Sequence, residues 1–303
     1  MEFRILGPLE VRGESGPVAV AGVKPRAVLA MLLLHANEPV SAERLASALW
    51  GEEAPAGAVK TVQVHVSRLR KALADPDAVV TTPAGYRLRV RPGELDAEQF
   101  ARSVEEGRRA LDAGDAERAA VLVREGLALW RGPALADLAF EPFASAEIAR
   151  LEEERLAALE ARVDADLAAA RHVELIAELQ QLTAEHPWRE RVHAQLMLAL
   201  YRSGRQADAL DAYRKARRIL VEQLGLEPGP ELHDLNQAML VHDPGLQPPA
   251  GRDGHASTRS SALPSPPNRT IGRGCGTTAG RCPGHGQCAR DHPAPGRVGR
   301  AGG

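Results

Sequence analysis

The order of secondary-structure patterns in the first 92 residues constrains the fold more than any other feature. Residues 3–22 alternate apolar and polar side chains around the turn RGESG, which predicts short antiparallel strands. Three helical patterns follow between Gly22 and Leu73, and Ser41 is the predicted N-cap of the second. The segment VVTTPAGYRLRV then predicts a β-hairpin. Strands, three helices and a terminal hairpin are the elements of a winged helix-turn-helix.

From Asp96 to about Leu240 the pattern changes to long segments rich in Ala, Leu, Glu and Arg, which predict helices. Several small residues recur with the spacing of a TPR array, including one period of 34 residues. Generic amphipathic periodicity is the alternative, but the 34-residue register favours repeats. A long charged helix over 143–170 interrupts the array, so we expect a compact helical module. The repeat positions are Gly114, Ala119, Val123, Gly126, Leu175, Leu179, Leu182, Pro187, Gly204, Ala209, Tyr213 and Ala216.

The sequence therefore predicts a mainly α protein with two domains and a disordered tail. We place a winged helix-turn-helix at 1–92, an all-α TPR-like domain at 93–246 and the tail at 247–303. From residue 251 onward the tail contains 12 Gly and 6 Pro among 53 residues and few large apolar side chains. Such a composition cannot bury enough apolar surface to fold.

Charge is segregated along the chain. The difference between basic and acidic residues is +3 over 1–91, −11 over 92–250 and +6 over 251–303. A polyanionic partner therefore suits the first segment and not the second. No long apolar run and no signal-peptide pattern is found, and all three cysteines lie in the last tenth of the chain. We expect a cytoplasmic protein with no membrane partner.

The third helical pattern, AVKTVQVHVSRLRKAL, carries the strongest functional signal. Its predicted buried stripe consists of Val62, Val66, Leu69 and Leu73. The opposite face holds cations, hydroxyls and a small apolar side chain, which suit guanine edges, phosphates and a thymine methyl group. A solvated basic face is the alternative, but the surrounding helix-turn-helix and wing favour DNA. We predict DNA contacts by Lys60, Thr61, Val64, Ser67, Arg68 and Lys71, by His65 and Arg70 at the flanks toward phosphate, and by Arg87 on the hairpin.

No pattern in the chain predicts catalysis. The histidines between 186 and 242 have neither paired carboxylates nor a nucleophile near them. The spacing C-x6-C-x2-H-x2-C-x3-H in the tail fits no standard zinc site. We therefore predict no enzyme activity, no cofactor and no metal. The alternatives to a DNA-binding regulator of this type are an interaction adaptor whose winged helix binds protein, and a repressor.

Two long stretches resemble a known family. LWGEEAPAGAVKTVQVHVSRLRKAL with VVTTPAGYRLRV looks like the OmpR-type winged helix. With DAEQFARSVEEGRRAL and RQADALDAYRKARRILVEQLGLEPGPEL, the chain resembles the antibiotic regulatory protein (SARP) family, whose second module is the bacterial transcriptional activator domain. The resemblance covers about residues 3–246. It implies that Arg87 lies on the wing and that the recognition helix carries Lys60, Thr61, Val64, Arg68 and Lys71.

The resemblance also implies a function. It implies an activator of secondary-metabolite or developmental genes that binds direct repeats in double-stranded DNA, one protomer per repeat. The same resemblance implies contacts with RNA polymerase and its sigma factor, and it leaves homodimer formation on DNA open.

Larger members of that family continue into an ATPase module, and LPSPPNRTIGR at 263–273 is similar to the linker that introduces it. The residues that follow contain no G-x-x-x-x-G-K-[ST] pattern, so no phosphate site is predicted. Their bias toward Gly, Arg, Pro and Cys favours a truncated or out-of-frame continuation.

Overall fold

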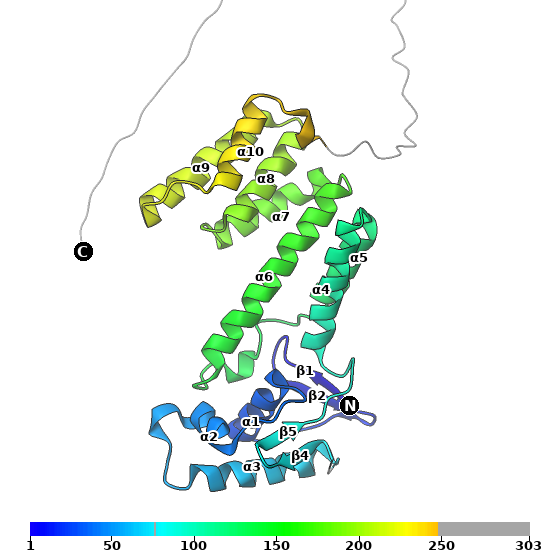
Figure 1. Cartoon of the computed structure of the whole chain (residues 1–303), viewed down its shortest axis with the longest axis vertical. Helices are drawn as coiled ribbons and strands as arrows, with labels where there is room; N and C mark the ends of the chain where they lie inside the picture. The colour runs from blue at the N-terminus through cyan, green and yellow to red at the C-terminus, as the bar shows by residue number, and fades with distance from the viewer. Residues whose placement is uncertain (76, 248–303) are drawn as a thin grey trace, which may run out of the picture. The chain divides into compact units, whose positions relative to one another are not determined.

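The structure, a computed structural model, describes residues 1–75 and 77–247 (Figure 1). Its N-terminal part has the winged-helix elements that the sequence predicted. In the first sheet Phe3 lies opposite Val11, and in the hairpin Val80 lies opposite Arg87. The elements are β1 (Glu2–Arg4), β2 (Glu10–Gly13), β3 (Gly16–Pro17), α1 (Val23–Leu34), α2 (Ala42–Trp50), the short η1 (Gly51–Glu53), α3 (Ala58–Leu73), β4 (Val79–Thr82) and β5 (Gly85–Leu88).

The local signals in the sequence account for these helices. The Ser41 hydroxyl accepts a hydrogen bond from the Arg44 amide at 3.1 Å, so the predicted N-cap of α2 is confirmed. In α3 the whole predicted stripe is buried, and it packs against α1 and α2. α1 is enclosed along most of its length, from Ala27 to Leu33. The buried stripe of α3 fixes which of its faces is exposed.

The hairpin is held against the connection between α1 and α2. Val40 and Tyr86 exchange two backbone hydrogen bonds of 2.8 Å. Gly85 has φ +131°, and a Cβ at this position would lie 2.1 Å from the carbonyl oxygen of Val40. Only glycine permits this approach, so the tight turn of the hairpin is tied to the winged-helix core.

A helical domain follows, as predicted (Figure 1). The charged helix expected over 143–170 is α6, and it packs along α5. Helices α4 and α5 approach closely at Gly126, where a Cβ would lie 3.1 Å from that of Ser103. The helices are α4 (Asp96–Asp112), α5 (Ala116–Leu127), α6 (Ala144–Ala168), α7 (His172–Glu185), α8 (Glu190–Arg202), α9 (Gln206–Leu224) and α10 (Pro230–Leu240), with short η2 (Ala136–Leu138) and η3 (Pro244–Leu246).

One turn geometry recurs between α4 and α5, α6 and α7, and α8 and α9. Each turn has one residue with positive φ, followed by an amide that donates to a carbonyl five residues earlier, as in a Schellman motif. Glycine takes the positive φ in two of the turns, at Gly114 (81°) and Gly204 (75°). In the middle turn it is taken by Ala170 (61°), 34 residues before Gly204. The amide–carbonyl pairs are Asp115–Ala110 (2.9 Å), Arg171–Asp166 (2.9 Å) and Arg205–Leu200 (3.0 Å). Helix α6 thus ends in the same type of turn as α4 and α8, but α10 ends in it too, at His242 (55°), so the expected interruption of the array by α6 stays a prediction.

The aspartate that opens α4 connects the two parts of the chain. Asp96 is 3% exposed, and its carboxylate accepts hydrogen bonds from the amides of Ile5 (2.8 Å) and Leu6 (3.0 Å). Arg131 lies 3.7 Å from the same carboxylate. Burial raises the pKa of Asp96, while the two amides and Arg131 act in the opposite direction. The carboxylate thus joins the segment after β1 to the first turn of α4.

Further contacts surround this carboxylate. The Arg131 amide donates to the carbonyl of Leu6 at 2.8 Å. Asp137 of η2 accepts from the Leu9 amide at 2.7 Å and pairs with Arg26 of α1 at 2.5 Å. One hydrophobic cluster accordingly runs from Phe3 to Ala158, and a second runs from Val163 to Met239. The domain boundary between residues 92 and 93 stays a prediction, because the first cluster contains residues from both sides of it.

The prediction of a disordered tail at 247–303 lies outside the described residues, Gln247 excepted, as do the linker-like segment and the Cys–His spacing. No helix in the described part of the chain is both long and apolar enough to cross a membrane.

Replacing Asp96 by alanine should lower the free energy of unfolding by at least about 2 kcal/mol. Two buried amides lose their acceptor, and an unsatisfied buried donor costs about 1–3 kcal/mol. Urea unfolding of the full chain measures the change. Glu98→Ala is the matched control, because Glu98 is an exposed acid in the same helical turn. Equal effects of the two substitutions would contradict the role given to Asp96.

Replacing Ala170 by glycine should raise the free energy of unfolding by about 0.5–1 kcal/mol. Glycine relieves about 1–2 kcal/mol of left-handed backbone strain, and the greater entropy of the unfolded chain offsets about 0.4–1 kcal/mol. Ala169, with φ −81°, has no such strain, so Ala169→Gly should instead destabilise the protein. Thermal unfolding of both variants checks the sign, and destabilisation by Ala170→Gly would refute the argument.

Candidate nucleic-acid interface

The exposed face of α3 carries most of the residues predicted from the sequence. Because the buried stripe faces α1 and α2, the opposite side of the helix is open to solvent. Val64, a β-branched apolar residue, is 49% exposed there. The structure therefore brings together on one exposed face Lys60, Val64, Ser67, Arg68 and Lys71.

The cations of this face have no acidic partners among the residues that the structure describes. None of the ion pairs found among residues 1–75 and 77–247 involves Lys60, Arg68 or Lys71. By contrast, the winged helix uses Lys24 and Arg26 in ion pairs with Glu141 and Asp137. The positive charge of α3 is thus available to an external anion.

His65 lies at the flank of the exposed face, where most of its ring is buried. Its side chain is 8% exposed and stacks on the Trp50 ring at a centroid distance of 6.5 Å. Burial lowers the pKa of His65, and the nearby Arg68 and Lys24 lower it further. A neutral imidazole still carries one N–H donor, and of its two ring nitrogens only Nδ1 is buried without a partner among the described residues. The phosphate contact of His65 therefore stays a prediction.

Arg70 and Thr61 lie at the border of the face and make contacts within the protein. The Arg70 guanidinium donates to the carbonyl of Val79 and to the hydroxyl of Thr81, both at 2.8 Å, and so ties α3 to β4. The Thr61 hydroxyl donates to the carbonyl of Gly57 at 3.4 Å. Arg70 thereby positions the hairpin relative to α3, and its contact with phosphate stays a prediction.

Arg87 lies on β5, opposite Val80 of β4. Its side chain is half-buried, and its Nε is buried without a hydrogen-bond partner among the described residues. The exposed end of the hairpin is formed by Pro83 and Ala84, which carry no charge. The wing therefore presents a neutral tip with Arg87 behind it.

The sequence analysis missed two exposed residues of α3, Val59 and Gln63. Val59 is 36% exposed, and Gln63 lies between Lys60 and Ser67 on the helix surface. The helical periodicity that placed Lys60 and Ser67 also places Gln63, because the three are spaced by three and four residues. The sequence prediction selected cations, hydroxyls and one apolar side chain, so it did not include the neutral amide of Gln63.

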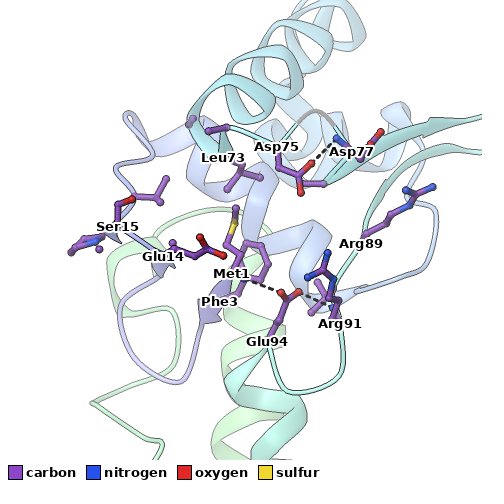
Figure 2. A pocket seen from close by; sticks show the side chains of 18 residues that line it. Met1, Phe3, Glu14, Ser15, Leu73, Asp75, Asp77, Arg89, Arg91 and Glu94 are labelled. Atoms are coloured by element: carbon purple, nitrogen blue, oxygen red, sulfur yellow. Dashed lines mark hydrogen bonds and ion pairs between the residues drawn. The ribbon is translucent and has the colours of Figure 1, made fainter.

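A hollow of about 900 Å³ lies beside the C-terminal end of α3 (Figure 2). Glu94 points to the N-terminal amine of Met1, at 2.8 Å, and also accepts from the amide of Arg91. Asp75 accepts from the amide of Asp77. The described residues that line the hollow include no histidine or cysteine, and no group of metal-ligating side chains was found in the described parts of the chain. We assign no chemistry to this hollow.

Two family descriptions match the chain in tandem. Residues 21–88 match "Transcriptional regulatory protein, C terminal", and residues 95–240 match "Bacterial transcriptional activator domain". Regulatory protein DnrI of Streptomyces peucetius is 40% identical over 256 residues, which are 81% of this chain and 94% of that protein. The chain belongs to the SARP family of transcriptional regulators.

Other SARP relatives are longer. Regulatory protein AfsR of Streptomyces coelicolor is 40% identical over 90% of this chain, which corresponds to 28% of that protein. A solved structure of EmbR from Mycobacterium tuberculosis, in complex with a low-affinity phosphopeptide, is 40% identical, with a TM-score of 0.78 over 80% of this chain and 65% of that chain. The relatives are transcriptional regulators, and the OmpR-type and activator modules inferred from the sequence are confirmed.

Replacing His65 by phenylalanine should flatten the dependence of stability on pH. With a lowered pKa in the folded state, His65 binds protons more strongly when unfolded, so its contribution to stability is lost as pH falls through its ordinary value of 6.5. Phenylalanine keeps a ring against Trp50 and does not titrate. Between pH 7 and 5 the two unfolding free energies should diverge by at most about 1.4 kcal/mol per pH unit. Parallel curves in urea titrations would refute this assignment.

Proposed function

We propose that this SARP-type regulator binds specific double-stranded DNA through the exposed face of α3 and activates transcription. The observation that carries the proposal is that three cations on that face, Lys60, Arg68 and Lys71, make no ion pair within the described part of the chain. Duplex DNA attracts such cations through counterion release. Arginine and lysine also donate to the O6 and N7 atoms of guanine in the major groove.

The form of the face supports duplex DNA as the ligand. A helix of 16 residues with one buried side presents its other side as a continuous ridge, and an α-helix fits the width of the major groove. Arg70 holds the hairpin beside this ridge. In a winged helix-turn-helix the wing then reaches the adjacent backbone, where we place Arg87, with Thr61 and Ser67 as further phosphate or base contacts.

The finer points of the function follow from the family resemblance. We propose that the protein binds direct repeats near promoters of antibiotic or other secondary-metabolite genes, or of developmental genes, one protomer per repeat. The helical domain then recruits RNA polymerase through its sigma factor. Two names support activation as the direction of regulation. The relatives are named regulatory proteins, and the second module is named an activator domain.

The test is a salt titration of the full chain on the duplex upstream of its own gene neighbourhood, with an unrelated duplex as control. Specific binding requires a clear preference for the upstream duplex and a steep loss of affinity with salt. Equal, weak binding to both duplexes would contradict the proposal for that region. In vitro transcription with RNA polymerase then distinguishes activation from repression.

The double substitution Arg68→Ala with Lys71→Ala should lower DNA affinity at least about tenfold and reduce the slope of log K against log salt by about 1–2, since each phosphate contact contributes about 0.9. Both side chains lie off the buried stripe, so the unfolding temperature should not change. The matched control replaces Lys215 and Arg218, an exposed lysine and arginine of α9, by alanine. Undiminished binding by the α3 variant would remove this face from the proposal.

A further inference from the structure

We propose that Gln63 is a specificity-determining residue of α3 and that it selects an adenine in the major groove. This inference rests on the proposed function and adds to it a residue and a base. It concerns a neutral side chain that the charge pattern of the sequence did not indicate.

The position of Gln63 supports direct contact with bases. It is exposed on α3, three residues after Lys60 and four before Ser67, so the three side chains are neighbours on the helix surface. Val64, also exposed, is the next residue along the chain. Gln63 thus lies at the edge of the cationic face, between Ser67 and Arg70, where its exposed side chain can reach the DNA groove if that face docks.

The amide of Gln63 is free to bind an external partner. It makes no hydrogen bond with any residue that the structure describes. Other glutamines are used internally: Gln99 donates to the carbonyl of Gly93 at 2.6 Å, and Gln206 donates to that of Met239 at 3.1 Å. Gln181 pairs with Glu185 on α7 at 2.8 Å. Docking on DNA therefore costs Gln63 no intramolecular hydrogen bond.

The chemistry of the amide selects the base. Gln63 is uncharged and adds nothing to the attraction of phosphates. Its carboxamide offers one N–H donor and one carbonyl acceptor side by side, which match N7 and the N6 amino group of adenine. Guanine presents two acceptors, N7 and O6, at the same edge. Its O6 would repel the carbonyl oxygen of Gln63, whereas the N–H donors of Arg68 or Lys71 match both acceptors.

The experiment is selection of binding sites from a random-sequence duplex library by the full chain. The variants are Gln63→Ala, Gln63→Glu and, as control, Gln181→Ala, which changes an exposed glutamine of α7. The wild type should select adenine at one position at least about tenfold over other bases. Gln63→Ala should lose that preference, keep the others and keep the salt dependence of binding to unrelated duplex.

Gln63→Glu gives the sharper test. Its carboxylate has no donor for N7 but accepts from the N4 amino group of cytosine, so the preference at that position should change from adenine to cytosine. A structural role for Gln63 would weaken all sites together without changing the base. Thermal unfolding confirms that the variants fold.

The outcomes separate this inference from the proposed function. If the wild type and Gln63→Ala select the same motif, or if the lost preference is for a base other than adenine, the inference is overturned while DNA binding stands. If the wild type selects no motif at all, sequence-specific binding fails, and the inference fails with it.

Discussion

The buried carboxylate of Asp96 is the interaction on which the arrangement of the described chain depends. A buried carboxylate is tolerated only with donors around it, and here the donors are the amides of Ile5 and Leu6. Those amides belong to the segment that leads out of the first strand, whereas the carboxylate opens the helical domain. This one carboxylate therefore holds together two segments that are far apart in sequence. Arg131 and Asp137 complete the junction from the helical side.

Within the winged helix, α3 and the hairpin are fixed to each other by two independent contacts. Arg70 joins α3 to β4, and Val40 pairs with Tyr86 of β5 at the point where Gly85 leaves no room for a side chain. A base-reading surface requires side chains held to within a fraction of an ångström. The same residue, Arg70, appears in the sequence as one more cation of a basic helix, and its positioning role is visible only once the hairpin is in place.

Periodicity predicted the face of α3 because a 3.6-residue repeat determines which side chains share a side of a helix. That argument correctly separated Lys60 and Arg68 from the buried stripe. It placed His65 at the edge of this face. Periodicity could not show that most of the His65 ring is buried there, because the ring stacks on Trp50, a residue of another helix. Repeat spacing likewise located the turns at Gly114 and Gly204. The turn at Ala170 has the same geometry without a glycine, so no glycine in the sequence indicated it.

The net charge of +3 over residues 1–91 is small, and the pairing of charges explains why it understates the basic face. Two buried carboxylates of the helical domain are paired within that domain. Asp166 is bound by Arg162 at 3.1 Å and by Arg171 at 2.9 Å. Glu160 is bound by Arg189 at 2.7 Å. These three arginines are therefore occupied. The cations on the exposed face of α3 have no ion-pair partner in residues 1–75 and 77–247, and an unpaired charge contributes fully when an anion binds. The distribution of ion-pair partners, more than the total charge, therefore supports α3 as the face proposed to bind DNA.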